Sequence, residues 1–319
     1  MEYNVENLFD TLHTACNDDW EFTPKGERQW SETRYWSKLG KLSRVIAAVG
    51  GDKPVDLLAL VEVENDSAMH DLTKRTKLWR MGYQYVISRS NDARGINVAL
   101  LYLPHRFRVI NNDSIRVLPP NNKLHQTRDV LHVAGELITG DTLDVYVCHF
   151  PSRRGGKLAD GYRAKVAKAL REHTDSIMNE RQHPLVLITG DFNAFYPEKL
   201  FSETLKVQLP HPHSSEMIQG YKLYLLTNKM KGRADVKGTY KYQGEWNQLD
   251  QFIVSGTLLK RFWTDAPNTS KDKCYIVDYP FLLQKDKSGE GVHPFRTYLG
   301  PYYQGGYSDH LPILLELNY

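Results

Sequence analysis

The stretch VLITGDFNAFYPE, residues 186–198, places a continuous apolar run directly before Asp191 and Asn193. An apolar run of this length, followed by polar turn residues, is typical of a buried β-strand. Because Asp and Asn also favour ordinary turns, the motif by itself fits a simple loop. The strand in front of it favours another interpretation, in which both side chains are held at a rigid strand tip for function.

Several other apolar runs in the chain are bounded by acidic, amide or histidine side chains. They carry Asn4 and Glu6 in YNVENLFD, Glu62 in DLLALVEVEN, His149 in VYVCHFPSRRGG, Asp250 in NQLDQFIVS, and Asp309 and His310 in GYSDHLPILLEL. Hard oxygen ligands of this kind bind Mg²⁺ together with waters and phosphate oxygens. A histidine aimed at the same point can offset negative charge on a phosphate. The pattern therefore predicts a metal-dependent phosphoester hydrolase.

Hydrophobic periodicity predicts two halves that each combine strands with amphipathic helices. Helices are expected at 31–49, where Ser31 can cap the start, at 66–80 and at 159–181. Strands are expected at 2–9, 55–62, 83–88, 96–103, 106–117, 128–138, 142–150, 184–190, 238–243, 248–254 and 311–317, with a loop-rich stretch over 264–307. Strands that carry helices on one face bury the other face against a second layer. The expected α/β fold is a four-layer αββα sandwich of two packed mixed β-sheets with helices outside, formed by one domain over residues 1–319.

The composition is that of an ordinary soluble globular protein, because 41% of the 319 residues are hydrophobic and 25% are charged. The net charge of +3 suits a polyanionic substrate but does not require one. No apolar stretch approaches the roughly 18–20 residues of a membrane span. The cysteines, Cys16, Cys148 and Cys274, have no metal-like spacing, and their odd number argues against a complete disulfide framework.

Met1 stands almost inside the first predicted strand, and no basic and then apolar signal segment precedes it. A natural start usually has a few residues of slack, so we expect that a leader has been removed. This would suit an exported protein, and the compartment stays open. We also expect a monomer.

Together these segments resemble, in order and in residue type, the endonuclease/exonuclease/phosphatase superfamily. Its members include pancreatic deoxyribonuclease, abasic-site endonucleases, inositol-polyphosphate 5-phosphatases and neutral sphingomyelinases. The resemblance extends from Tyr3 to Leu317. GDFN followed much later by SDHLP is specific, because order, spacing and strand context must all agree. NVENLFD with LVEVEN is similar to uncharacterised bacterial members. The resemblance implies a deoxyribonuclease I-like fold.

The resemblance also implies which residues hold the metal. Glu62 is expected to be the principal metal-binding carboxylate, with Asn4 beside the metal and the catalytic aspartate. Glu6, where many relatives have Asp, shares a face of a regular strand with Asn4 and should reach the metal or its water. Asn7 would then face away and be structural unless the strand bulges. Asp309 is expected to contact a second metal or the leaving-group side. The expected cofactor is Mg²⁺, with Mn²⁺ as an alternative.

The remaining polar residues are assigned to catalysis. Asp191 is expected to orient and deprotonate the attacking water, and Asn193 to hold the phosphate or that water. Asp250 can accept a hydrogen bond from one imidazole nitrogen of His310, which leaves the other nitrogen to face a non-bridging phosphate oxygen. For His149 the resemblance to the deoxyribonuclease branch implies a second imidazole that contacts phosphate, with general acid catalysis as one option. A solvent-facing strand end is the alternative.

Basic residues near these motifs are candidate substrate ligands. Arg153 and Arg154 lie in the Gly-rich segment SRRGGK, and guanidinium groups match phosphate geometry. A solvated basic loop is an equally weighted alternative. The stretch 222–241 interleaves basic residues with tyrosines, a pattern that can bind a nucleic-acid strand. The same pattern is common in exposed loops, and that interpretation is slightly preferred.

The sequence thus predicts a phosphodiesterase or nuclease in which water attacks phosphorus in line with the leaving oxygen. A phosphatase or phospholipase-C-type enzyme that acts on a small or lipid phosphoester is the first alternative. A nucleic-acid partner predicts a basic, extended groove and strong salt dependence, whereas a small substrate predicts a tight pocket. A catalytically silent binding protein of the same fold is the alternative from another class. It is disfavoured because every core catalytic position carries a competent residue.

Overall fold

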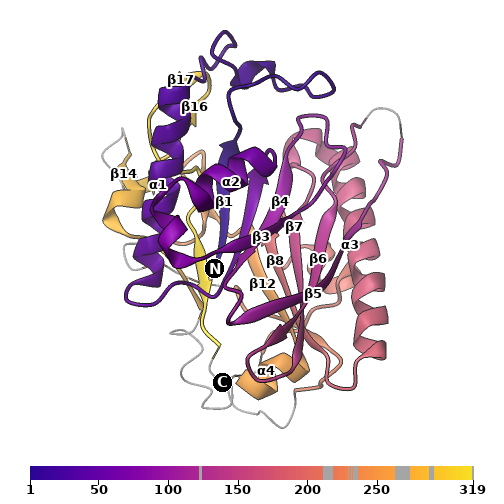
Figure 1. The fold of residues 1–319 in the computed structure, drawn as a ribbon. Helices are drawn as coiled ribbons and strands as arrows, with labels where there is room; N and C mark the ends of the chain where they lie inside the picture. The colour runs from indigo at the N-terminus through magenta and orange to yellow at the C-terminus, as the bar shows by residue number, and fades with distance from the viewer. Residues whose placement is uncertain are drawn as a thin grey trace.

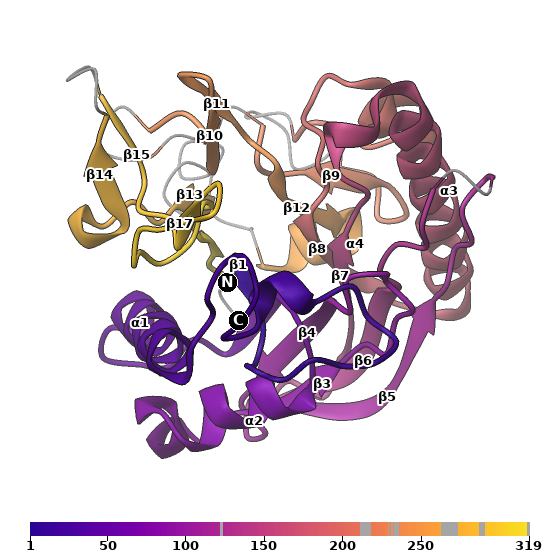
Figure 2. The same ribbon diagram turned by 90° about the horizontal axis from the view of Figure 1, so that it is seen from above.

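The computed structural model describes residues 1–121, 124–210, 218–228, 230, 232, 236–262, 274–286 and 291–317. Two six-stranded β-sheets pack face to face, and helices cover their outer faces (Figure 1). Helices α1 (Glu32–Gly50) and α2 (Asp66–Lys74) lie beside the first sheet, and α3 (Gly156–Glu180) lies beside the second (Figure 2). The expected four-layer αββα sandwich is therefore confirmed. Parts of the 222–241 and 264–307 stretches lie outside the described residues.

The first sheet has the strand order β13-β18-β1-β2-β4-β3. β1 and β2 run parallel while the other neighbouring strands are antiparallel, so the sheet is mixed as expected. Its strands are β1 (Glu2–Leu8), β2 (Leu57–Val63), β3 (Gln84–Ile87), β4 (Asn97–Tyr102), β13 (Cys274–Ile276) and β18 (Ile313–Leu315). Because parallel strands present their carboxyl ends at the same edge, the polar ends of β1 and β2 lie together.

The second sheet has the strand order β5-β6-β7-β8-β12-β9, and only β7 and β8 are parallel among its pairs. Its strands are β5 (Phe107–Ile115), β6 (Val130–Leu137), β7 (Thr142–His149), β8 (Leu185–Asp191), β9 (Leu223–Leu225) and β12 (Asp250–Ser255). In register, Asp191 at the end of β8 pairs with His149 at the end of β7 and with Asp250 at the start of β12. Backbone pairing alone therefore brings three predicted site residues into one row.

Smaller elements lie outside the two sheets. Three two-stranded ladders are formed by β10 (Tyr240–Tyr242) with β11 (Glu245–Asn247), β14 (Leu283–Lys285) with β15 (Val292–Pro294), and β16 (Tyr298–Leu299) with β17 (Tyr302–Tyr303). The remaining helical segments are α4 (Gly256–Phe262), η1 (Trp20–Phe22), η2 (Lys77–Met81), η3 (Arg153–Gly155), η4 (Leu200–Thr204) and η6 (Pro280–Leu282). The sequence did not predict β9, β13 or α4, because elements of three to seven residues offer too few positions for a periodic pattern.

The helix expected at 66–80 is divided into α2 and η2. Thr76 lies between them with an extended backbone, and its hydroxyl oxygen accepts a hydrogen bond from Leu78 N. The same hydroxyl donates to the carbonyl oxygen of Leu72. A threonine side chain that serves nearby backbone groups competes with the helical hydrogen-bond pattern, which explains the break. The cap expected at Ser31 is present, since its hydroxyl accepts a hydrogen bond from Arg34 N.

Two hydrophobic clusters stabilise the layers. The larger combines side chains of both sheets, such as Val61 and Val98 with Val145 and Phe252, and also includes apolar side chains of α1 and α2. The smaller packs α3 against the outer face of the second sheet. Cys148 belongs to this second cluster and is buried, as expected, and all three cysteines are free. In the described part of the chain, no helix combines the length and apolarity that a membrane crossing requires.

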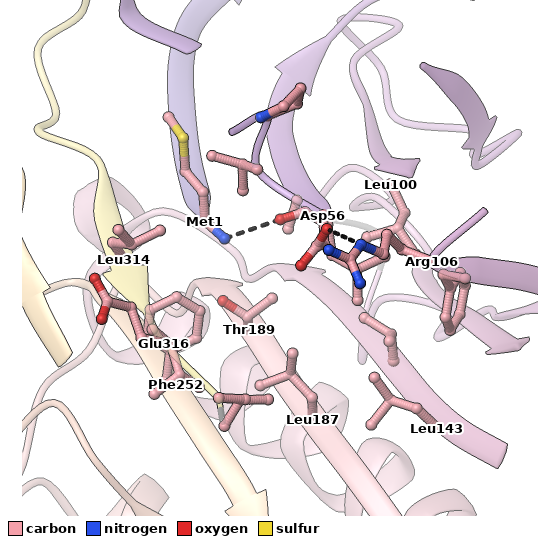
Figure 3. Close-up of a pocket in the computed structure, with 18 of the residues that line it drawn as sticks. Met1, Asp56, Leu100, Arg106, Leu143, Leu187, Thr189, Phe252, Leu314 and Glu316 are labelled. Atoms are coloured by element: carbon pink, nitrogen blue, oxygen red, sulfur yellow. Dashed lines mark hydrogen bonds and ion pairs between the residues drawn. The ribbon is translucent and has the colours of Figure 1, made fainter. Parts of the chain in front are cut away.

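A cavity of about 520 Å³ opens between the two sheets beside Met1 (Figure 3). Its lining is mostly apolar and includes Leu143, Leu187 and Phe252. Met1 and Leu187 precede Asn4 and Asp191 on their strands, so the cavity lies at the other end of the sandwich from the polar strand ends. None of the predicted site residues lines it.

The end of β8 is packed so tightly that there is no room for a side chain at Gly190. Its φ is 134°, and a Cβ atom there would lie 1.9 Å from the carbonyl oxygen of Cys148. We predict that Gly190→Ala lowers the free energy of unfolding by about 1–3 kcal/mol or more, because β7 and β8 must move apart. Chemical denaturation measures this. The matched control is Gly161→Ala in the exposed face of α3, where no atom lies within 4 Å. It should stabilise by about 1 kcal/mol, so equal stabilities of the two variants would contradict the prediction.

Candidate active site

Asp191 is the residue around which the predicted site residues gather. Its Oδ2 atom accepts a hydrogen bond from Asn4 Nδ2 at 3.2 Å, across the two sheets. The same oxygen lies 3.7 Å from His149 Nε2 and 3.9 Å from His310 Nε2. Its Oδ1 atom accepts a hydrogen bond from the backbone N–H of Asn193 at 2.8 Å. Side chains from separate strands and both sheets therefore converge on one carboxylate.

The surroundings of Asp191 make its carboxylate more basic than that of an exposed aspartate. Burial raises its pKa to about 7, and the nearby Asp250 carboxylate contributes to the rise. The charge of His310 acts in the opposite direction. The Asn193 amide nitrogen donates to the Phe150 carbonyl oxygen at 3.1 Å and lies 3.4 Å from Asp191 Oδ2. Asn193 thus supports the Asp191 carboxylate through both its backbone and its side chain.

His310 and Asp250 form the hydrogen-bonded pair that the sequence predicted. His310 Nδ1 lies 2.7 Å from Asp250 Oδ2, and both side chains are buried. Burial alone lowers the pKa of His310, but the charge and hydrogen bond of Asp250 outweigh it and raise the pKa well above its usual value. The protonated imidazole therefore donates its Nδ1–H to Asp250 and turns Nε2 towards Asp191. The ring of Tyr240 packs on this imidazole, with 4.9 Å between ring centroids.

His149 lies beside the same carboxylate in a different protonation state. Burial, followed by the charges of Arg128 and Arg94, lowers its pKa well below the usual value. Its Nε2 atom lies 3.6 Å from Glu62 Oε1, and its buried Nδ1 has no hydrogen-bond partner among the residues that the structure describes. The two site histidines therefore differ, since His310 is cationic and His149 is neutral.

A local distortion of β2 sets the direction of the Glu62 side chain. Its φ is 67°, and the register of β2 against β4 shifts between Val61 and Val63. Its Oε2 atom accepts a hydrogen bond from the backbone N–H of Asn7 at 2.9 Å. Because non-glycine residues rarely adopt positive φ, and such residues gather at functional sites, the distortion supports a role for Glu62.

The structure differs from the prediction at Glu6 and Asn7. β1 bulges there, with φ values of 51° and 53° for the two residues, so the regular alternation that would place Glu6 beside Asn4 is lost. The Glu6 carboxylate accepts hydrogen bonds from the backbone N–H groups of Thr297 and Tyr298. Burial raises its pKa to about 7. Both Glu6 oxygens thus anchor a loop, whereas the backbone N–H of Asn7, which was expected to be structural only in a strand without a bulge, donates to Glu62.

Asn4 is held in place by two hydrogen bonds to protein groups. Its Oδ1 atom accepts a hydrogen bond from the backbone N–H of Glu6 at 3.0 Å, while Nδ2 donates to Asp191. The amide therefore positions the Asp191 carboxylate and is itself held by the backbone of Glu6. Asn4 thus lies beside Asp191, as expected, and its contact with a metal stays a prediction.

Lys38 is a charged residue of this region that the sequence did not single out. It is buried in α1 and donates hydrogen bonds to Thr297 Oγ1 and to the carbonyl oxygen of Tyr307. Burial lowers its pKa to about 8, against the opposing charges of Glu6, Asp309 and Glu62. Helical periodicity places Lys38 next to the apolar positions of α1, but only the packed loops show what it contacts. Its ammonium offsets the negative charge of the three carboxylates.

Glu62 and Asp309 would be suitable ligands for a hard divalent cation, and the charges of both act on Lys38. Both carboxylates are partly exposed, and Glu62 Oε1 receives no hydrogen bond from a described residue. Mg²⁺ usually keeps several waters and takes only one or two protein carboxylates. Donor atoms of Asp191, Asp250 and His310 also lie within 4.8 Å of one another. All three residues of that trio are buried, which makes it a poorer match for a hydrated ion.

Among the arginines near the site, the sequence analysis did not identify the buried Arg128. Arg153 donates to Glu198 at 3.0 Å and lies over the ring of Phe195, while Arg154 is exposed in η3. Arg128 is buried just before β6, and its charge interacts with Glu62 and Asp191. Nothing in the segment QTRDVLHV distinguishes Arg128 from an ordinary residue at a strand start. Only the pairing of β6 with β7 brings it near His149.

Glu2 extends the acidic interior of the site. It lies in β1, is completely buried, and both carboxylate oxygens lack a hydrogen-bond partner within the described ranges. Burial raises its pKa well above the usual value, and the charges of Asp250 and Asp191 add to the rise. The buried surroundings of Glu2 therefore disfavour its charged form. Its position at the start of the first strand carried no signal of this environment.

Comparisons with known proteins agree with this geometry. The sequence profile described as the Endonuclease/Exonuclease/phosphatase family matches residues 1–319. No curated protein gives a significant match. The solved structure of truncated Caenorhabditis elegans TDP2 is 19% identical, with a TM-score of 0.52 and coverage of 87% of this chain and 90% of that chain. The catalytic domain of human Nocturnin with bound sulfate is 20% identical, with a TM-score of 0.50 and coverage of 88% and 86%.

A third similar structure is the mannosyl-6-phosphatase of Bacteroides thetaiotaomicron. It is 15% identical, with a TM-score of 0.54, and 100% of this chain and 98% of that chain are covered. At such identities these structures establish the fold alone. The family profile, in contrast, spans every strand end described above. The chain therefore belongs to the endonuclease/exonuclease/phosphatase family of phosphoester hydrolases.

Proposed function

We propose that this protein is a Mg²⁺-dependent phosphodiesterase in which water attacks phosphorus in line with the leaving oxygen. The observation that carries the proposal is the position of Asp191, which lies within 4 Å of a cationic His310 and a neutral His149. A base, a positive charge and a neutral hydrogen-bond donor around one point are the groups that phosphoester hydrolysis requires.

Asp191 is the proposed base that orients the attacking water and accepts its proton. Asn4 and Asn193 hold the carboxylate from two sides, so its oxygens cannot rotate away from the site. Such support matters because a catalytic group that is misplaced by about 1 Å can lose on the order of 10²-fold in rate. Neither asparagine needs to touch the substrate for this role.

His310 and His149 are proposed to contact the phosphate in different ways. Asp250 fixes the orientation of His310, so the cationic Nε2–H can face a non-bridging oxygen and offset the charge that develops there. His149 presents Nε2 towards the same region and can donate a neutral hydrogen bond. Mg²⁺ held at Glu62 and Asp309 would supply charge and orientation for the phosphate and would ease departure of the leaving oxygen.

Aromatic residues beside His310 favour a diester with a second substituent. Tyr240 packs on His310, and the two also form a β-bridge. Side chains alternate along a strand, so Tyr242 of β10 lies on the same face as Tyr240. Tyr242 is 58% exposed, which leaves its ring available to stack on a nucleobase or another planar group. A sugar phosphate monoester is the second candidate substrate. It is the substrate class of the Bacteroides relative, whose match spans the largest share of both chains among the three structures compared.

Hydrolysis of a chromogenic phosphodiester beside the matching monoester tests the proposal. We predict Mg²⁺-dependent turnover of the diester that EDTA abolishes. His310→Ala and Asp191→Asn should each lower kcat/KM by about 10²–10⁴-fold, as is typical when general acid–base or charge-stabilising groups are lost. His105→Ala, at an exposed turn, is the matched control and should keep wild-type activity.

The alternatives give different results in the same assay. Turnover of the monoester alone would replace the diesterase proposal with a phosphatase. No turnover of either compound, or of single-stranded DNA and RNA, by a folded protein would favour a silent binding protein. Full activity of His310→Ala would exclude the proposed arrangement of the site.

The stacking surface gives a separate prediction. Tyr242→Ala should raise KM for an oligonucleotide by about 5–100-fold, since base stacking contributes roughly 1–3 kcal/mol, and should leave hydrolysis of a small diester nearly unchanged. Tyr221→Ala is the matched control, because Tyr221 is 54% exposed but lies next to β9, which pairs with the far end of β12 from Asp250. Equal KM values for the two variants with the oligonucleotide would show that Tyr242 does not contact it.

A further inference from the structure

A second cluster of potential metal ligands lies between α3 and the outer face of the second sheet. It combines His132 from β6, Asp113 from β5 and His173 from α3, and one donor atom from each lies within 4.8 Å of the others. Asp113 Oδ1 is 2.8 Å from His132 Nδ1, and its Oδ2 is 3.5 Å from His173 Nε2. Figure 1 shows α3 running beside β5 and β6, so three separate segments supply the cluster.

Each imidazole of this cluster has its other nitrogen held by the protein. His132 Nε2 lies 2.9 Å from Asp144 Oδ1, and Arg181 holds the Asp144 carboxylate through two hydrogen bonds of 3.0 and 3.1 Å. His173 Nδ1 lies 2.9 Å from the Tyr146 hydroxyl. Metal-binding histidines almost always have an outer partner of this type, which fixes the tautomer and turns the other nitrogen to the ion.

One end of the cluster is buried and the other end is exposed to solvent. The side chain of His132 is 3% exposed, that of His173 is 28% exposed and that of Asp113 is 58% exposed. The imidazole planes of the two histidines are inclined at 65°, with 5.2 Å between ring centroids, so they do not stack on each other. An ion can therefore be reached by solvent from the Asp113 side, which leaves room for a water as a further ligand.

We propose that His132, His173 and Asp113 form a second cation site, selective for Zn²⁺ or a similar transition-metal ion, that fastens α3 to the second sheet. Two imidazole nitrogens and one carboxylate suit Zn²⁺, whereas Mg²⁺ prefers oxygen ligands alone. A tetrahedral Zn²⁺ site with three protein ligands keeps its fourth position for water. The site is separate from the phosphoester site and does not depend on the proposed reaction.

Zinc titration of the metal-stripped full chain tests this proposal. Isothermal titration calorimetry in excess Mg²⁺ should show one Zn²⁺ equivalent that is retained in His310→Ala and in the exposed-residue control His105→Gln. His173→Gln should remove it, and Tyr146→Phe should weaken the affinity by about 10–100-fold, as expected when an outer partner is lost. Zn²⁺ should also raise the Tm of the wild type and not that of His173→Gln.

Two controls keep the result interpretable. Circular dichroism and Tm in EDTA should show that His173→Gln folds as the wild type does, since His173 is half-buried at the surface of α3. Hydrolysis of the phosphodiester by His173→Gln should equal that of the wild type, which separates this site from the catalytic one. The proposal is wrong if His173→Gln binds Zn²⁺ as tightly as the wild type. It is also wrong if the only Zn²⁺ equivalent disappears in His310→Ala.

Discussion

The hydrogen bond from Asn4 to Asp191 joins the two sheets at the place where the site is formed. Asn4 belongs to the first sheet and Asp191 to the second, so the bond forms only if the sheets pack face to face in one alignment. Backbone pairing then places His149 and Asp250 on either side of Asp191. Glu62 reaches the same point from the first sheet, through its 3.6 Å approach to His149. The geometry of the site is thus a consequence of how the two layers pack.

Charge balance is the second condition for this arrangement. Asp191, Asp250 and Glu62 crowd into a largely buried region, and isolated carboxylates are costly there. The cationic His310 pairs with Asp250, and Arg128 acts on Glu62 and Asp191 from the side of β6. Polar groups held rigidly in a dry site stabilise developing charge better than water does, because they need no reorganisation during the reaction.

Positive φ angles occur at residues whose side chains or N–H groups leave the direction that a regular strand would give them. Glu6, Asn7, Glu62 and Asn193 have φ values of 51°, 53°, 67° and 48°. At each position the chain leaves the strand geometry and redirects a side chain or an N–H group: Glu6 towards a loop, Asn7 towards Glu62, and Asn193 towards Asp191. Such conformations persist only where the surrounding structure compensates for their cost. Here the compensation comes from hydrogen bonds within the site.

Sequence patterns alone determined the layered fold, because strand and helix periodicities extend over long runs such as β8 and α3. They also identified His310 with Asp250, and Asp191 at a strand tip, since these residues stand at the ends of apolar runs. Only the tertiary structure decided that Glu6 anchors a loop, that Asn7 contacts Glu62, and that Lys38, Arg128 and Glu2 surround the site. A bulge reverses the side-chain alternation on which strand predictions depend, and contacts between residues far apart in the chain leave no local periodic signal.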